Sequence, residues 1–312
     1  MNFEVIKNDF YEKGWCKVSD FFDPSFIKEI EKALHDFVID KVDDLIAGEI
    51  HYVDKYDQSK IKQINSIHVL SVKSKFFKDL LFNEKVINLM EYILDDDVEP
   101  QWSQLFAKPA RVGLAAPMHQ DNYYWNVQDN RTVTLWMAID EVFHSNAGVS
   151  YYEKSHKLGI IEHEESFAKG TSQKVPDAII NDFTQNSLIT PTLEPGDILL
   201  HHGAVIHGST HNLSDYDRRG MSMWYKAKSA EVNKEKLRMY EQSLHEQIEI
   251  MKEYIDIFRQ EGNPTGYRNT HPLNGRIVFY NHTVEIKEEE VKEETKADMI
   301  NKMIAPIRIT TD

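Results

Sequence analysis

The chain has 312 residues, of which 41% are hydrophobic and 11% aromatic, so it can bury a sizeable core in one large domain or two. Its 51 acidic residues outnumber its 36 Lys and Arg residues, which gives a formal net charge of −15. Nucleic acids and anionic membranes bind clustered positive charge, so this balance argues against both as partners.

Cysteine content and the N-terminal segment indicate a compartment. Cys16 is the only cysteine, which excludes an intrachain disulfide and a thiolate metal cluster. The N-terminus has neither a basic region nor a long apolar stretch. Nowhere does the chain approach the ~18 consecutive apolar residues of a spanning helix. We therefore expect a soluble, cytoplasmic protein.

Two amphipathic helices are predicted before residue 100. Asp23 followed by Pro24 is typical of a helix start, because an acidic N-cap and a proline at the first helical position both favour it. Apolar residues then recur at spacings of three and four, at Ile27, Ile30, Leu34 and Phe37. The same spacing returns at Val86, Met90, Ile93 and Leu94, before an acidic run and Pro100. We expect both helices to pack on the outside of a sheet core.

Short strand-like runs broken by turn residues replace the helical pattern between residues 101 and 227. The predicted strands are Trp102–Ala107, Thr132–Ile139, Gly148–Tyr152, Asp197–His201 and Gly220–Ala227. Many short strands at this spacing predict a sandwich or a barrel, and the jelly roll is a natural member of that class.

The period becomes helical again after residue 228. Ser229 is a suitable N-cap, and seven apolar residues spaced by three or four follow between Leu237 and Phe258. A stripe of this size is seldom exposed in a monomer, so we expect it to pack on the core or to form a homo-oligomer interface. Glu285–Lys302 is rich in charge and predicts a solvated helix or tail. We divide the chain into residues 1–228 and a helical extension, residues 229–312.

The strongest local motif is the pair His119 and Asp121, separated by Gln120. Side chains two residues apart on a strand share a face, so both could point toward one metal ion. The pattern alone is weak, because it recurs by chance and a surface histidine beside an exposed carboxylate is the simpler interpretation.

A second motif strengthens the first. A turn and an apolar run lead to His207, and Arg218 and Arg219 follow shortly afterwards. Two imidazoles and one carboxylate on one face of iron(II) leave three coordination positions open. Those positions can take a bidentate 2-oxo acid and dioxygen. The remote carboxylate of the 2-oxo acid then needs a fixed cation, for which the planar fork of arginine is suited.

These residues resemble the phytanoyl-CoA dioxygenase family of iron(II)- and 2-oxoglutarate-dependent oxygenases. The family's iron motif looks like His119-Gln120-Asp121 and its distal histidine looks like His207, within His207-Gly208-Ser209. The resemblance implies that Ser209 and Arg218 bind the distal carboxylate of 2-oxoglutarate. It covers roughly residues 8–226 and includes Phe10–Trp15, Phe21–Pro24, Lys108-Pro109 and Trp136–Asp140. The chain departs from the family after the central strand, where Asn146-Ala147-Gly148 stands in place of an Asn-Gly pair and Glu153-Lys154-Ser155-His156 in place of Pro-Gly-Ser-His.

Several neighbouring residues have competing interpretations. Trp125 is our first choice for contact with substrate or 2-oxoglutarate, although aromatic residues are most often core. Lys108 could approach the cosubstrate, although a lysine before proline is ordinarily exposed. His201 and His202 are better interpreted as supporting or surface residues than as ligands, and His202 is the replacement if His207 is not one. Arg219 is the alternative to Arg218, because adjacent strand residues point to opposite faces.

The sequence thus predicts a double-stranded β-helix (jelly roll) flanked by N-terminal helices and a long C-terminal helix. The predicted function is an iron(II)- and 2-oxoglutarate-dependent dioxygenase that hydroxylates an unactivated C–H bond of a small-molecule substrate. The resemblance implies that 2-oxoglutarate is decarboxylated to succinate as dioxygen is cleaved. Two alternatives stay open. One is a cupin-like metal-binding protein or isomerase without 2-oxoglutarate, and the other is a catalytically silent domain whose C-terminal helix binds a partner.

Overall fold

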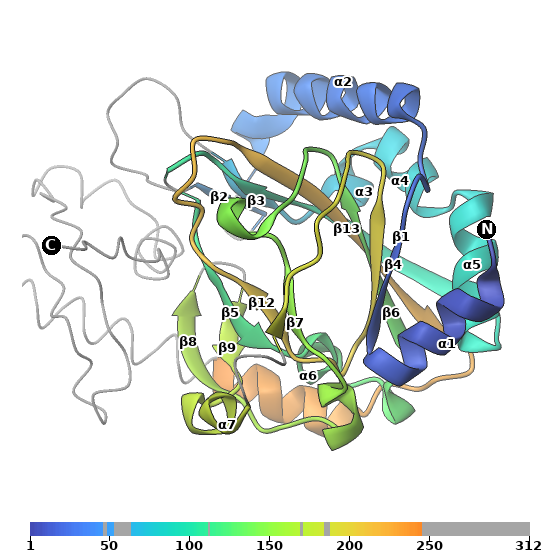
Figure 1. The fold of residues 1–312 in the computed structure, drawn as a ribbon, viewed down its shortest axis with the longest axis vertical. Helices are drawn as coiled ribbons and strands as arrows, with labels where there is room; N and C mark the ends of the chain where they lie inside the picture. The colour runs from blue at the N-terminus through green and yellow to red at the C-terminus, as the bar shows by residue number, and fades with distance from the viewer. Residues whose placement is uncertain (46–48, 53–63, 112, 169–170, 184–187, 245–312) are drawn as a thin grey trace, which may run out of the picture.

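The structure is a computed structural model, and it describes residues 1–45, 49–52, 64–111, 113–168, 171–183 and 188–244 (Figure 1). Two antiparallel sheets face each other. The larger has the order β1 (Trp15–Val18), β11 (Ile198–His202), β6 (Thr132–Ala138), β13 (Arg218–Ala227), β4 (Val98–Lys108), β3 (Ile64–Ile67) and β2 (Ile50–Tyr52). The smaller has the order β10 (Leu188–Ile189), β7 (Ser150–Tyr152), β12 (His207–Ser209) and β5 (Ala116–His119). A two-stranded sheet pairs β8 (Glu164–Ala168) with β9 (Thr171–Lys174). The predicted jelly roll is confirmed.

Helices cover the outer face of the larger sheet, with α2 above it and α1 and α5 at its side in Figure 1. The α-helices are α1 (Phe3–Lys13), α2 (Pro24–Lys41), α3 (Leu70–Lys73), α4 (Lys75–Leu81), α5 (Glu84–Leu94), α6 (Asp121–Trp125) and α7 (Asp177–Asp182). Short 3-10 turns are η1 (Val42–Asp44), η2 (Gln128–Asn130), η3 (His144–Asn146) and η4 (Ser155–Leu158). Among the residues that the structure describes, no helix is long and apolar enough to cross a membrane.

Strand alternation divides the hydrophobic residues between two cores. In β6, Val133, Leu135 and Met137 pack toward the helices, whereas Trp136 and Ala138 pack between the sheets. The core between the sheets also contains Trp15, Val142, Val149, Tyr151, Leu193, Leu199 and Val205. Both faces of the larger sheet are therefore buried at β6 and β11, which explains why these two strands are rich in apolar residues on both faces.

The predicted elements need small corrections. Both predicted N-terminal helices are present. Helix α2 begins at Pro24, as the sequence indicates, but the side chain of Asp23 makes no capping hydrogen bond, so the proline is the residue that favours this start. The predicted strand from Gly148 begins at Ser150, because residues 144–146 form a 3-10 turn before it. Helix α1 carried no prediction of its own, because its buried face consists of Ile6 and Phe10 only.

The start of the C-terminal extension contacts the core. Its helix begins at residue 234 rather than after Ser229, because the side chain of Asn233 accepts a hydrogen bond from the backbone N–H of Lys236 at 3.1 Å. Ser229 is not the N-cap, and its hydroxyl bonds Asp96 instead. Tyr240 lies against Tyr123 and Tyr124 of α6, with ring centroids 5.9 and 5.6 Å apart. The rest of the predicted helix and Glu285–Lys302 lie outside the described residues, so the homo-oligomer interface stays a prediction.

Candidate metal centre

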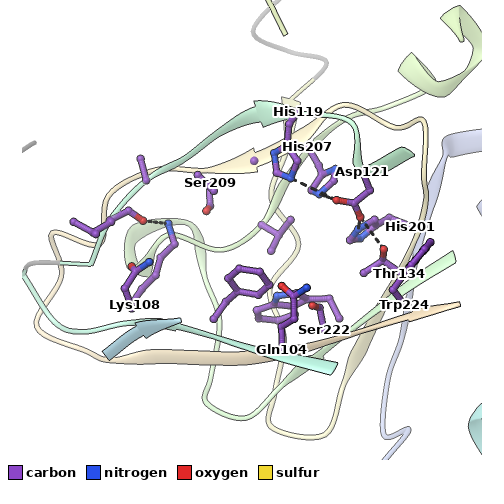
Figure 2. A pocket seen from close by; sticks show the side chains of 18 of the residues that line it. Gln104, Lys108, His119, Asp121, Thr134, His201, His207, Ser209, Ser222 and Trp224 are labelled. Atoms are coloured by element: carbon purple, nitrogen blue, oxygen red, sulfur yellow. Dashed lines mark hydrogen bonds and ion pairs between the residues drawn. The ribbon is translucent and has the colours of Figure 1, made fainter. Parts of the chain in front are cut away.

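Two neighbouring strands and the helix after one of them bring His119, Asp121 and His207 together. Strands β5 and β12 pair antiparallel, with His119 directly opposite His207. Asp121 is the first residue of α6 rather than a strand residue, which corrects the prediction. Because the backbone of Gln120 is still extended, Asp121 nevertheless turns to the same side as His119. Its Oδ1 lies 3.6 Å from Nε2 of His119 and 3.7 Å from Nε2 of His207 (Figure 2).

Backbone carbonyls fix the orientation of both imidazoles. Nδ1 of His119 donates to the carbonyl of Pro117 at 2.7 Å, and Nδ1 of His207 donates to that of Val205 at 3.1 Å. The Nε2 lone pairs therefore face the carboxylate, as metal-binding histidines require. The three ligand atoms lie within 4.8 Å of one another, so they could hold one metal ion.

The charge states of His207 and Asp121 also suit a metal. Burial lowers the pKa of His207 well below its usual range, and the neighbouring His119 and His201 lower it further. Burial raises the pKa of Asp121, but His207, His119 and His201 together outweigh it, so this pKa lies well below its usual range. A neutral imidazole and a carboxylate are the states that ligate a metal, and this donor set matches non-haem iron(II).

Gln120 points away from the centre and holds the surrounding loops. Its side-chain amide donates to the carbonyls of Gly159 and Ala204 at 2.8 and 2.7 Å and accepts from the N–H of Ile161 at 2.7 Å. Its backbone N–H donates to Nε2 of His163 at 3.0 Å. The middle residue of the motif therefore helps to position His119 and Asp121 on either side of it.

Two buried cations lie at the other end of the same pocket. Lys108 on β4 is the cross-strand partner of Arg218 on β13. Nζ of Lys108 donates to the carbonyls of Leu114 and Thr210 at 2.5 and 2.6 Å, so this lysine is buried despite the proline after it. Burial, followed by repulsion from Arg218, lowers the pKa of Lys108 well below its usual range.

Arg218 is only 1% exposed and has unused hydrogen-bonding capacity. It donates to the carbonyl of Ala147 at 2.9 Å and lies 5.3 Å from the ring of Trp136. Its Nε has no hydrogen-bond partner, and among the described residues no carboxylate forms an ion pair with it. Burial lowers its pKa to about 9. A buried cation with an unpaired N–H donor is the group that an incoming carboxylate would satisfy.

Arg219 points to the opposite face, as strand alternation predicts. It forms ion pairs with Asp140 and Glu31, both at 2.6 Å, and is 35% exposed. Ser209, by contrast, lines the same pocket as Arg218.

The loop that departs from the family pattern contains a residue with a left-handed backbone. This residue is Ala147, with φ 64° and ψ 47°.

Alternate residues of β4 and β13 line the pocket between the metal centre and the cations. These are Trp102, Gln104, Phe106 and Lys108 on β4, with Arg218, Ser222 and Trp224 on β13. Trp125 also lines the pocket, and its ring stacks on Trp224 with centroids 4.0 Å apart. The cavity measures about 170 Å³. Trp102 and Trp224 were not predicted to line the site. Side chains two residues apart on a strand share a face, so counting in steps of two from Lys108 and Arg218 leads to both.

Gly220 provides the space for Trp136 beside Arg218. A Cβ atom at Gly220 would lie 1.8 Å from Cζ2 of Trp136, so only glycine fits here. Trp136 is buried in the core between the sheets.

The two histidines at the end of β11 point in opposite directions. His202 packs against Phe10 of α1, with ring centroids 5.6 Å apart, and its Nδ1 accepts from the N–H of Ala204. It is therefore not placed to replace His207. His201 points inward, and its Nε2 lies 3.1 Å from Oδ2 of Asp121.

Comparison with known proteins agrees with this geometry. The sequence profile of the phytanoyl-CoA dioxygenase (PhyH) family matches residues 10–220. The chain is 22% identical over 232 residues to a probable alpha-ketoglutarate-dependent hypophosphite dioxygenase of Stutzerimonas stutzeri, covering 73% of this chain and 80% of the relative. It is 23% identical over 238 residues to the ectoine dioxygenase of Sphingopyxis alaskensis, covering 72% of this chain and 76% of the relative.

Solved structures show the same fold. The apoform of EctD from S. alaskensis has a TM-score of 0.59 at 20% identity, with 73% of this chain and 78% of that chain covered. SnoN, a non-heme alpha ketoglutarate dependent epimerase from nogalamycin biosynthesis, has a TM-score of 0.55 at 15% identity, with 73% and 83% covered. Because the family profile spans most of the chain and the metal and cation sites lie inside it, the protein belongs to the phytanoyl-CoA dioxygenase family of iron(II)- and 2-oxoglutarate-dependent oxygenases.

Proposed function

We propose that the protein uses iron(II), 2-oxoglutarate and dioxygen to hydroxylate an unactivated C–H bond of a small molecule. In this proposal His119, Asp121 and His207 hold the iron, and Arg218 with Ser209 binds the distal carboxylate of 2-oxoglutarate. When bound, iron and 2-oxoglutarate supply the oxidative decarboxylation that activates dioxygen. The chain itself orients the reactants and keeps water away from them.

The observation that carries the proposal is the state of Arg218. A buried guanidinium normally has a carboxylate partner, because burying an unpaired charge is costly. Among the residues that the structure describes, Arg218 contacts a backbone carbonyl and a tryptophan face, its Nε has no hydrogen-bond partner, and Asp140 influences it only at a distance. The distal carboxylate of 2-oxoglutarate would provide the missing acceptor at the wall of the pocket that contains the metal triad.

Lys108 supports the same end of the pocket. Its Nζ is held by two carbonyls, and repulsion from Arg218 contributes to its lowered pKa. One anionic carboxylate between these residues would relieve that repulsion. We propose that Lys108 adds positive potential there and that Arg218 makes the directional hydrogen bonds.

The substrate would occupy the aromatic part of the pocket. Trp125 and Trp224 are stacked, and Trp102 lies 4.3 Å from Trp224 between ring centroids. Large aromatic faces hold an apolar substrate surface and exclude water from the reacting atoms. Hydroxylation is the proposed outcome for this chain, whereas solved structures of similar fold include a non-heme alpha ketoglutarate dependent epimerase and a carbocyclase.

Anaerobic titration tests the cosubstrate. Protein with iron(II) should develop the visible charge-transfer band of the iron–2-oxoglutarate chelate when 2-oxoglutarate is added. Iron binding without that band would instead favour the cupin-like alternative. Admitting labelled dioxygen should then produce labelled succinate, and product analysis with a turned-over substrate should show one labelled oxygen in a new hydroxyl group. An isomerised product without added oxygen would contradict hydroxylation.

A further inference from the structure

A chain of buried side chains behind the metal triad ends on one oxygen of Asp121. The hydroxyl of Tyr151 lies 3.0 Å from Nδ1 of His201, and Nε2 of His201 lies 3.1 Å from Oδ2 of Asp121. Thr134 donates its hydroxyl to the same Oδ2 at 2.7 Å. Figure 2 shows His201 and Thr134 converging on this carboxylate from the side away from His119. No motif in the sequence links these residues.

The carboxylate determines the direction of these hydrogen bonds. A neutral imidazole has one N–H donor and one acceptor nitrogen. Nε2 of His201 faces a carboxylate oxygen, which only accepts, so Nε2 carries the proton. Nδ1 is then the acceptor, and the Tyr151 hydroxyl donates to it. Tyr151 is itself fixed, because it is fully buried and stacks on Trp15 with ring centroids 5.1 Å apart and planes 6° apart.

The two oxygens of Asp121 therefore differ. Oδ2 accepts two hydrogen bonds, from His201 and Thr134. Oδ1 is the oxygen that faces Nε2 of His119 and of His207. A carboxylate that bound a metal through both oxygens would have to give up the contacts at Oδ2.

We propose that His201 is a positioning residue that, with Thr134, restricts Asp121 to one-oxygen coordination. The proposal rests on the proposed function of the triad. A facial triad leaves three positions, two for a bidentate 2-oxo acid and one for dioxygen. If Asp121 bound through both oxygens, one of these positions would be lost. His201 thus keeps the metal open to both reactants.

Manganese(II) alone is the probe for this role, since its free form is counted by electron paramagnetic resonance and its bound water by water relaxation. His201→Gln keeps an N–H donor near the position of Nε2, whereas the shorter His201→Asn does not reach Oδ2. His202→Gln is the matched control, because the neighbouring histidine faces α1. We expect His201→Asn to lose about 10–100-fold in affinity for Mn(II). We expect His201→Gln and His202→Gln to stay close to the wild type.

The bound water separates positioning from general damage. The wild type and His201→Gln should hold three exchangeable water ligands on Mn(II), and a folded His201→Asn variant two, because Asp121 would then bind through both oxygens. A folded His201→Asn variant with wild-type affinity and water count would overturn the proposal. If that variant does not fold, Thr134→Val decides, and unchanged affinity and water count there overturn it equally. Failure of the wild type to bind Mn(II) would overturn the metal centre itself, and with it the proposed function.

Discussion

Replacing Arg218 with alanine tests the cosubstrate site most directly. The guanidinium is fully buried and has an unpaired Nε, so a bound carboxylate would form charge-assisted hydrogen bonds with it in a pocket shielded from water. Removing one member of such a buried pair costs about 2–5 kcal/mol. Because Lys108 would still provide a positive charge at this end of the pocket, we expect the lower part of that range. About 2–3 kcal/mol corresponds to a 30- to 150-fold loss of affinity for 2-oxoglutarate.

Arg219→Ala is the matched control for Arg218→Ala. Arg219 is the next residue on the same strand, but its partners are Asp140 and Glu31 outside the pocket. Its removal should leave the affinity for 2-oxoglutarate unchanged and lower the free energy of unfolding by up to about 1 kcal/mol. Affinity is measured from the absorbance of the chelate as 2-oxoglutarate is added anaerobically to the iron-loaded protein. Equal, small losses in both variants would refute the assignment of Arg218.

Three further predictions concern the metal, acid stability and one strained residue. His207→Ala should weaken Mn(II) binding by more than ~100-fold, whereas His202→Ala should not, and the reverse result would exchange their roles. The pKa of His163 is about 3 in the folded protein because of burial, so the unfolded chain takes up this proton first, near pH 6.5. The neutral state of His163 therefore contributes fully to the free energy of unfolding above pH 6.5, and this contribution falls by about 2 kcal/mol at pH 5. His163→Gln should make the free energy of unfolding in urea less dependent on pH. Ala147→Gly should raise the free energy of unfolding by about 1 kcal/mol, because Ala147 has a left-handed backbone, and an unchanged midpoint would contradict this strain.

The three residues that the structure brings together, His119, Asp121 and His207, could be named from the sequence because they carry local signals. The His119 motif and the apolar strand before His207 are each readable within ten residues, and strand alternation separates Arg218 from Arg219. Asp121 was predicted to be a strand residue, which is wrong, but it lies on the same side as His119, as predicted. The strand ends at His119, and the extended backbone of Gln120 carries Asp121 to the same side.

The contacts of His201 with Asp121 and Tyr151 could not be predicted from the sequence, because they join segments that are far apart in the chain. His201 meets Asp121 across 80 positions of the chain, and Tyr151 meets His201 across 50. No periodicity links such residues, since only the pairing of the sheets brings them together. Lys108 illustrates the same limit. A lysine before proline is ordinarily exposed, but this one ends a strand that is covered by the loop carrying Thr210.

The placement of the site between two sheets has a consequence for residues that touch no ligand. His119 and His207 belong to the smaller sheet, whereas Arg218 belongs to the larger. The distance between the triad and the guanidinium therefore depends in part on the spacing of the two sheets, to which side chains such as Leu199 and Val205 in the core between the layers contribute. Replacing one of these side chains with a smaller or larger apolar one would therefore alter the length of the dicarboxylate that fits. We therefore expect discrimination between 2-oxoglutarate and its shorter or longer homologues to depend on the hydrophobic core as well as on Arg218 and Ser209.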